Sequence, residues 1–177
     1  FSDNVPVLYL PAGPQLNQYA IRPNFSAVRT FQTTSTYGEV ITHPDQVSNV
    51  MRRAFHHLRN GQPGPVIVEI PADVAVEEVP DGVLERYRPV KATASQANPS
   101  DVLEATKVLM QAKNPVILAG QGVLYAGASD ELVELSELLQ IPVMTTMAGK
   151  SAFPEKHPLA LGSASGVMNR PVDNFLT

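Results

Sequence analysis

A helix, a tight turn and a buried strand follow one another between Val47 and Val74, and this succession constrains the fold more than any other stretch. Apolar residues recur there at the spacing of one helical face, namely Val47, Val50, Met51, Ala54, Phe55 and Leu58. Pro44 suits a first helical turn, and Thr42 with Asp45 has the spacing of a capping pair. Asn60-Gly61 is expected to end the helix, because glycine tolerates the left-handed conformation that closes it.

The strand predicted next is Val66–Ile70, which is β-branched and almost wholly apolar. A strand of that composition is usually buried on both faces, as in a parallel sheet covered by helices. Further helices are predicted from Pro99 onward and over 130–139, and further strands over 5–10, 115–119 and 141–146. Residues 15–36 are expected to form a loop with at most one helical turn. The alternation of helix and apolar strand is typical of a parallel α/β sheet.

The two later helices have their own start signals and apolar faces. Asn98 is expected to cap the first of them, with Pro99 and Asp101 in its first turn. Its apolar stripe comprises Val102, Ala105, Leu109 and Ala112. The inward residues of the second helix are expected to be Leu132, Leu135 and Leu139.

Turn signals and weak periodicity between residues 77 and 97 predict a linker. The fold class we expect is therefore α/β, with two incomplete Rossmann-like parallel-sheet domains, residues 1–76 and 98–177, joined by that linker. Each half offers only two clear strands, fewer than a typical sheet contains. Since the chain also begins with Phe1 in place of methionine, we expect the natural protein to continue past both ends.

Composition narrows the classes of partner. The net charge of −4 gives no reason to expect nucleic acid or an anionic membrane as a partner. Cysteine is absent, so thiol chemistry and disulfides are excluded. The sequence contains no apolar run of membrane-spanning length, and a cytoplasmic location is the default expectation.

Gly120-Gln-Gly122 directly follows a predicted strand and is the strongest candidate for a ligand site. Glycines at the carboxyl end of a parallel strand allow backbone N–H groups to approach a phosphate or ribose. The alternative is a plain strand-to-helix turn. Classical NAD binding is not expected, because Tyr125 occupies the position of the third glycine and no acidic residue ends the next strand.

Other polar residues carry weaker signals. The loop Thr145–Gly149 should lie beside Gly120, although threonine also commonly ends strands. Arg52-Arg53 is interpreted as a solvated helix face, and Glu69 with Asp73 is not expected to form an acid/base pair. The four histidines, His43, His56, His57 and His157, are not spaced as metal ligands.

Two segments carry a family resemblance. Gly61-Gln-Pro-Gly-Pro-Val66, followed by Glu69-Ile-Pro-Ala-Asp-Val74, resembles the end of the pyrimidine-binding domain of thiamine diphosphate enzymes of the acetolactate synthase type. The run from Ala112 to Gly122, then Ile141-Pro-Val, then 149–162, is similar to the central domain of the same enzymes. The likeness covers almost the whole chain.

The resemblance implies an enzyme of three α/β domains with its cofactor at a subunit interface, in a homo-oligomer (dimer or tetramer). Such a transferase or lyase uses thiamine diphosphate and Mg²⁺ to decarboxylate a 2-oxo acid, and carboligases join the product to a second carbonyl. The activating glutamate and the Gly-Asp-Gly…Asn motif of the family are both absent from this sequence. We therefore assign no catalytic residue and no metal ligand, and expect the isolated chain to be inactive.

Only a few residues carry over from the family. Phe31-Gln32 resembles a pair that lines the active site of acetolactate synthases, although Thr36 stands where those enzymes have a lysine. In flavin-binding members the FAD lies against loops matched here by Gly120, Gly122, Thr146 and Gly149, and a further glycine pair resembles Gly162 and Gly166. Other members bind ADP at this place, or nothing.

Two alternative functions, from other classes of protein, remain open for this sequence. The chain could be a non-catalytic Rossmann-type module that binds FAD, ADP or a coenzyme A nucleotide at Gly120 and Gly122. It could also be a structural element whose sheet edges pair with a partner chain.

Overall fold

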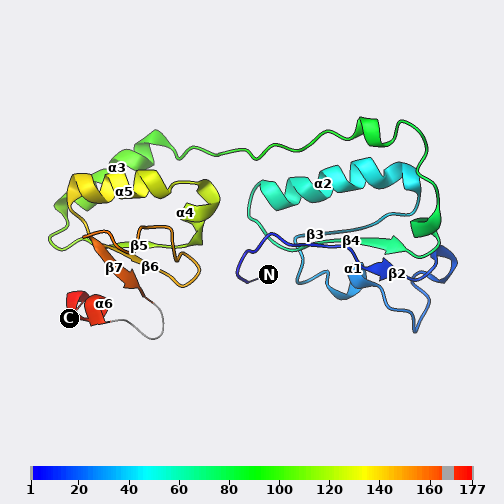
Figure 1. Cartoon of the computed structure of the whole chain (residues 1–177), viewed down its shortest axis with the longest axis horizontal. Helices are drawn as coiled ribbons and strands as arrows, with labels where there is room; N and C mark the ends of the chain where they lie inside the picture. The colour runs from blue at the N-terminus through cyan, green and yellow to red at the C-terminus, as the bar shows by residue number, and fades with distance from the viewer. Residues whose placement is uncertain (1, 165–169, 177) are drawn as a thin grey trace. The chain divides into compact units, whose positions relative to one another are not determined.

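The computed structural model describes residues 2–164 and 170–176, and the chain divides into two compact units, Phe1–Thr93 and Ala94–Thr177 (Figure 1). Each unit has its own sheet, and every strand pair within the described residues is parallel. The predicted α/β class with two parallel-sheet units is therefore confirmed. The strands predicted around Val68 and Leu118 belong to different sheets.

The described part of the first unit contains four strands and two α-helices: β1 (Leu8–Tyr9), β2 (Ala12–Gly13), α1 (Ala27–Thr30), β3 (Tyr37–Val40), α2 (Val47–Arg59) and β4 (Val66–Pro71). Its 3-10 helices are η1 (Leu16–Gln18), η2 (Pro44–Gln46), η3 (Val74–Val76) and η4 (Leu84–Arg86).

Strand β4 lies at the centre of this sheet, because all three other strands pair with it. β1 and β2 follow one edge of β4 in the same register, and β3 pairs along the opposite edge. The sequence predicted one strand over 5–10 that ended at Pro11. The structure instead has two short strands on either side of Pro11, whose carbonyl still accepts a hydrogen bond from Ile70 N at 3.0 Å.

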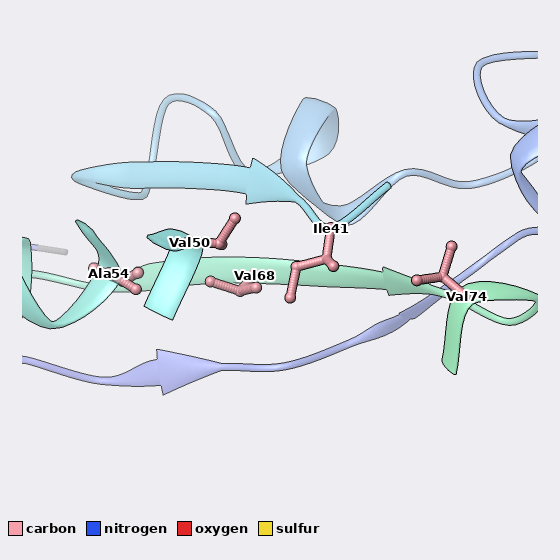
Figure 2. Close-up of a cluster of buried hydrophobic side chains, with 6 residues drawn as sticks. Ile41, Val50, Ala54, Val68 and Val74 are labelled. Atoms are coloured by element: carbon pink, nitrogen blue, oxygen red, sulfur yellow. The ribbon is translucent and has the colours of Figure 1, made fainter. Parts of the chain in front are cut away.

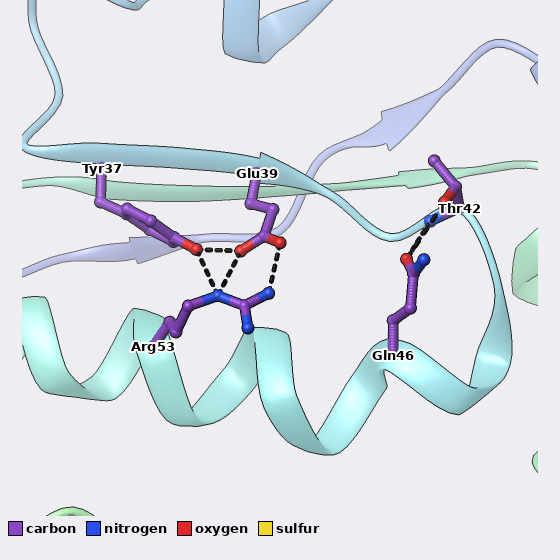
Figure 3. Close-up of polar contacts among 5 residues, drawn as sticks. All are labelled: Tyr37, Glu39, Thr42, Gln46 and Arg53. Carbon is purple, nitrogen blue, oxygen red and sulfur yellow. Dashed lines mark hydrogen bonds and ion pairs between the residues drawn. The ribbon is translucent and has the colours of Figure 1, made fainter.

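β3 is a strand that the sequence did not predict, since residues 15–36 and the segment after them have no clear apolar alternation. Its residues Tyr37 and Glu39 project toward α2, where both contact Arg53 (Figure 3). The strand is therefore defined by backbone pairing with β4 and by polar contacts with a helix, neither of which leaves a periodic apolar pattern.

Helix α2 begins differently from the prediction. Thr42 and Asp45 do not form a capping pair. The Oε1 atom of Gln46 accepts hydrogen bonds from Thr42 N at 2.9 Å and Thr42 Oγ1 at 3.1 Å (Figure 3), and His43 Nδ1 accepts from Asp45 N at 3.2 Å. The expected helix end is confirmed, because Asn60 is the C-cap and Gly61 follows with a φ of +72°.

The core of the first unit lies between α2 and β4. Six buried side chains form it, five of them labelled in Figure 2: Ile41, Val50, Ala54, Val66, Val68 and Val74. The side chains from α2 belong to the apolar face that the sequence predicted. The stretch Val47–Val74 therefore packs its own helix against its own strand in this core.

Residues 77–93 belong to the first unit and pack against its helix α2. Val83 is fully buried, and its carbonyl accepts a short hydrogen bond from the Ser48 hydroxyl. Thr93 donates to Asn60 Oδ1 from its backbone N at 2.8 Å. The boundary between the two compact units falls between Thr93 and Ala94, whereas the sequence predicted a linker over 77–97. The family-level domain bounds stay a prediction.

Over residues 94–164 and 170–176, the second unit contains three strands and four helices: α3 (Pro99–Gln111), β5 (Ile117–Ala119), α4 (Gln121–Ala126), α5 (Ser129–Leu139), β6 (Val143–Thr145), β7 (Ala160–Ser163) and α6 (Arg170–Leu176). The sheet order is β5-β6-β7, with a register shift between Val143 and Met144. Ala119, Leu132, Val143 and Phe153 are its buried core cluster.

Two expectations for this unit need correction, and one strand was not predicted. Asn98 caps α3 as predicted, but no residue of that helix is buried, and Val102 of its stripe is 51% exposed. In α5 the inward position expected for Leu135 is taken by Ser136, which is buried and donates to Ile141 O at 2.8 Å. Strand β7 was not predicted, because Gly162 interrupts its short apolar run. No helix among the described residues is long and apolar enough to cross a membrane.

Candidate functional site

A hollow of about 480 Å³ in the first unit lies between the end of α1 and the start of β3, and we refer to it as the α1–β3 hollow. Its lining residues are Val28, Arg29, Gln32, Ser35, Thr36, Tyr37 and Gly38. Gln32 and Thr36, both singled out from the sequence, are thus brought together in one hollow.

The free donors of this hollow are Arg29 and Gln32. Ser35 Oγ donates to Phe31 O at 2.9 Å, and Thr36 Oγ1 donates to Pro65 O at 3.0 Å, so both hydroxyl hydrogens are engaged. Within the described residues the Arg29 guanidinium and the Gln32 amide have no hydrogen-bond partner. A cation and an amide donor suit a carboxylate or carbonyl oxygen.

Phe31 does not line the hollow. It is the C-cap of α1 and is 40% exposed, and its ring lies edge-on to Phe25 with centroids 6.2 Å apart. The structure therefore separates the predicted pair, with Gln32 in the hollow and Phe31 outside it.

Glu69 determines where the segment before the hollow lies. This carboxylate of β4 is fully buried. Its Oε2 atom accepts hydrogen bonds from Ser26 Oγ at 3.0 Å, Tyr19 Oη at 3.1 Å and Val28 N at 3.1 Å. Because Ser26 is the N-cap of α1 and Val28 lies in it, one carboxylate atom attaches this short helix to the central strand.

The other carboxylate atom, Oε1, is buried without a hydrogen-bond partner among the described residues. A Cβ placed on Gly13 would lie 2.9 Å from it, so glycine at position 13 leaves room for the carboxylate. From the sequence, Glu69 is expected only to be a strand residue. The available signal was a single carboxylate inside the apolar run Val66–Ile70, where a buried charge requires specific partners.

Tyr19 shares in this cluster, since its hydroxyl also lies 2.7 Å from Ser26 Oγ. Burial raises the pKa of Tyr19 above its ordinary value, the Ser26 hydrogen bond opposes that shift, and the charge of Glu69 adds to it. Asp73 acts separately, because its carboxylate accepts from Leu16 N at 3.1 Å and from Val74 N at 3.1 Å.

In the second unit, the Thr146–Gly149 loop lies directly against the end of β5. Thr146 N donates to Ala119 O at 2.9 Å, and Gly149 N donates to Thr146 Oγ1 at 3.0 Å. A Cβ on Gly149 would come within 2.5 Å of Ala119 O and 2.8 Å of Gly120 Cα. The two loops are therefore adjacent, as expected for neighbouring parallel strands, and glycine at 149 permits the close approach.

The remaining glycines of the predicted site lie elsewhere. Gly122 is in the first turn of α4, where a Cβ would meet no atom within 4 Å. Gly162 lies inside β7 with a φ of +96° and pairs with Met144. Gly166 is outside the described residues. A role of Gly120, Gly122, Thr146, Gly149 or Gly162 in binding a cofactor stays a prediction.

The histidines have local partners. His43 accepts the Asp45 N–H noted above, and His157 Nε2 lies 3.2 Å from Glu137 Oε1. Across residues 2–164 and 170–176, no group of three or more histidine, aspartate or glutamate side chains is placed to hold a metal ion.

Comparison with known proteins gives one family and several relatives. Residues 102–177 match the family described as thiamine pyrophosphate enzyme, central domain. The chain is 38% identical over 144 residues to the probable acetolactate synthase large subunit of Methanocaldococcus jannaschii, which covers 77% of this chain and 24% of that protein. It is 34% identical over 173 residues to the acetolactate synthase of Arthrospira platensis, covering 92% of this chain and 29% of the relative.

A third relative is named for a different activity. The glyoxylate carboligase of Escherichia coli is 32% identical over 167 residues, covering 91% of this chain and 27% of that protein. The chain thus spans about a quarter of the length of the curated relatives that it matches.

Replacing Glu69 by alanine is expected to lower the free energy of unfolding by about 3 kcal/mol, because one buried donor and two half-buried donors lose their acceptor. Glu69→Gln should lose less, since the amide oxygen can replace Oε2. Glu77→Ala, at an exposed position, is the control and should stay within about 0.5 kcal/mol of wild type in urea unfolding. Equal effects of Glu69→Ala and Glu77→Ala would contradict the assignment.

The raised pKa of Tyr19 predicts a loss of stability in alkali. The protonated phenol is favoured in the folded state, so this contribution is complete below about pH 10 and declines as the pH rises through the folded pKa. Tyr19→Phe should flatten that decline in urea unfolding followed across this range. Tyr125→Phe, at a ring that is 50% exposed, should keep the wild-type slope, and an unchanged slope in Tyr19→Phe would refute the prediction.

The two glycines near β5 should respond oppositely to alanine. Gly149→Ala is expected to destabilise the second unit by about 1–3 kcal/mol, because the added methyl meets backbone atoms. Gly122→Ala is expected to stabilise it by up to about 1 kcal/mol, since the position is helical and open. Thermal unfolding of both variants measures the difference, and a reversed order would show that the loop packing is misassigned.

Proposed function

Because the chain belongs to the acetolactate synthase-like superfamily of thiamine diphosphate enzymes, we propose that it is part of a carboligase that decarboxylates a 2-oxo acid and joins the product to a second carbonyl compound. The observation that carries the proposal is the similarity to acetolactate synthases and a glyoxylate carboligase across both units. Thiamine diphosphate, when bound, supplies the carbanion chemistry of such reactions.

The residues of this chain do not by themselves provide a site for that cofactor. The Gly-Asp-Gly…Asn motif expected for Mg²⁺ and diphosphate is not in the sequence, so we derive no catalytic step from these residues. Their proposed contribution is to line the active site. Gln32 supports this role, because its amide is free and faces a hollow that also contains Arg29 and Thr36.

We further propose that the second unit binds FAD or ADP beside Gly120. The support is the close approach of Gly149 to the Ala119–Gly120 backbone, which leaves two glycine positions without side chains at the ends of adjacent parallel strands. Backbone N–H groups at such a place suit a phosphate or ribose.

The setting that we propose is a cytoplasmic homo-oligomer with Mg²⁺ in the complete enzyme and no nucleic-acid or membrane partner. The net charge of −4 supports the last point. A non-catalytic nucleotide-binding module is less favoured, because the similarity to enzymes extends through the first unit, which such a module would not require.

The complete protein that contains this chain is expected to consume pyruvate or glyoxylate when thiamine diphosphate and Mg²⁺ are supplied, whereas the 177-residue chain alone should not. Gln32→Ala in the complete protein should lower kcat/KM by about 3- to 10-fold, the effect of losing one hydrogen bond. Gln62→Ala is the matched control, because among the described residues the Gln62 amide hydrogen-bonds to Asn4 and lines neither hollow. Turnover by the chain alone, or equal losses in the two variants, would contradict the proposal.

A further inference from the structure

Four nitrogen-bearing side chains line a hollow of about 360 Å³ on α2, separate from the sites described above. They are Arg52, Arg53, His56 and His57, and Val90 completes the lining; we refer to this as the α2 hollow. The spacing explains the gathering, because residues four apart on a helix are neighbours and both Arg52–His56 and Arg53–His57 have that spacing.

Only one of the two arginines is neutralised. Arg53 forms an ion pair with Glu39 and also donates from Nε to Tyr37 Oη at 3.0 Å (Figure 3). Glu39 accordingly raises the pKa of Arg53. Arg52 has no carboxylate partner and no side-chain hydrogen bond within the described residues. The positive charge of Arg52 therefore remains available on an otherwise acidic chain.

The helix dipole accounts for only part of this arrangement. Cationic side chains near a helix C-terminus are stabilised by the partial negative charge there, but the effect fades beyond the last turn. His56, His57 and Arg59 lie in the last turn of α2, whereas Arg52 does not. The helix dipole therefore does not stabilise the charge of Arg52, although Arg52 lies one turn from His56 and both side chains are hydrogen-bond donors.

The walls of the hollow are held by specific contacts. Arg59 Nη1 donates to Val90 O at 2.7 Å, which attaches the segment carrying Val90 to the end of α2. The His57 ring stacks on Tyr37 with centroids 4.5 Å apart and planes 14° from parallel. Two sides of the hollow are therefore fixed before any ligand arrives, which lowers the entropic cost of binding.

We propose that the α2 hollow binds a phosphate or diphosphate group, with Arg52 and the two imidazoles as its donors. A guanidinium donates in a planar fork that matches phosphate oxygens, and each imidazole supplies an N–H. Among the described residues, Glu39 is the carboxylate that forms an ion pair with this lining, and Arg53 already engages it. The lining therefore presents net positive charge to a ligand, and an anion placed between Arg52 and His56 can accept hydrogen bonds from both side chains.

The test is a titration of the 177-residue chain with pyrophosphate, and separately with inorganic phosphate, at low ionic strength. Calorimetry should give saturable binding of one equivalent. If the site is built for a diphosphate, pyrophosphate should bind more tightly than phosphate. If it is built for a single phosphate, the two affinities should be equal. The ring resonances of His56 and His57 should shift during the titration. Arg52→Ala should weaken binding by about tenfold or more, the effect of losing a charge-assisted hydrogen bond.

Lys107→Ala is the matched control, because it removes one positive charge from α3 of the other unit. It should leave the affinity within about twofold, the change expected from screened long-range charge alone. Arg52→Lys keeps the charge but loses the fork, and it should recover only part of the affinity. The proposal is overturned if no saturable binding occurs, if Lys107→Ala weakens binding as much as Arg52→Ala, or if the histidine rings do not respond.

Discussion

A single buried carboxylate organises the part of the first unit that carries the candidate site. Glu69 lies in the central strand β4, and its Oε2 atom accepts from a tyrosine, a serine and a backbone amide of the segment 19–28. That segment has almost no regular structure of its own, since α1 comprises four residues. Its position, and with it the start of the α1–β3 hollow, therefore depends on an acceptor more than 40 residues away in the chain.

The elements that the sequence predicted are those with strong local signals. Val66–Ile70 is apolar enough to identify a strand buried on both faces, and the apolar face of α2 has a helical period that packing preserves. Gly61 and Asn98 mark helix ends through backbone conformation and capping, which depend only on neighbouring residues. The adjacency of Gly120 and Gly149 also followed from general rules, because parallel strands present their carboxyl ends at one edge of a sheet.

What could not be predicted depends on partners distant in sequence. Strand β3 pairs with β4 through its backbone and contacts α2 through Tyr37 and Glu39, so it has no apolar period. The roles of Glu69 and Arg52 depend on the groups that surround them in space. A single charged residue in the sequence of a strand or helix does not specify those groups. Gln46 likewise replaces the expected Asp45 at the start of α2, because its longer side chain reaches Thr42.

Amide hydrogen exchange at Val28 tests the central claim most directly. If Glu69 holds α1 against β4, the Val28 N–H should exchange about as slowly as the amides of β4 itself, although Val28 lies in a four-residue helix beside exposed loops. Exchange of the Val28 amide at the rate of freely exposed backbone would contradict the claim that this carboxylate positions the candidate site.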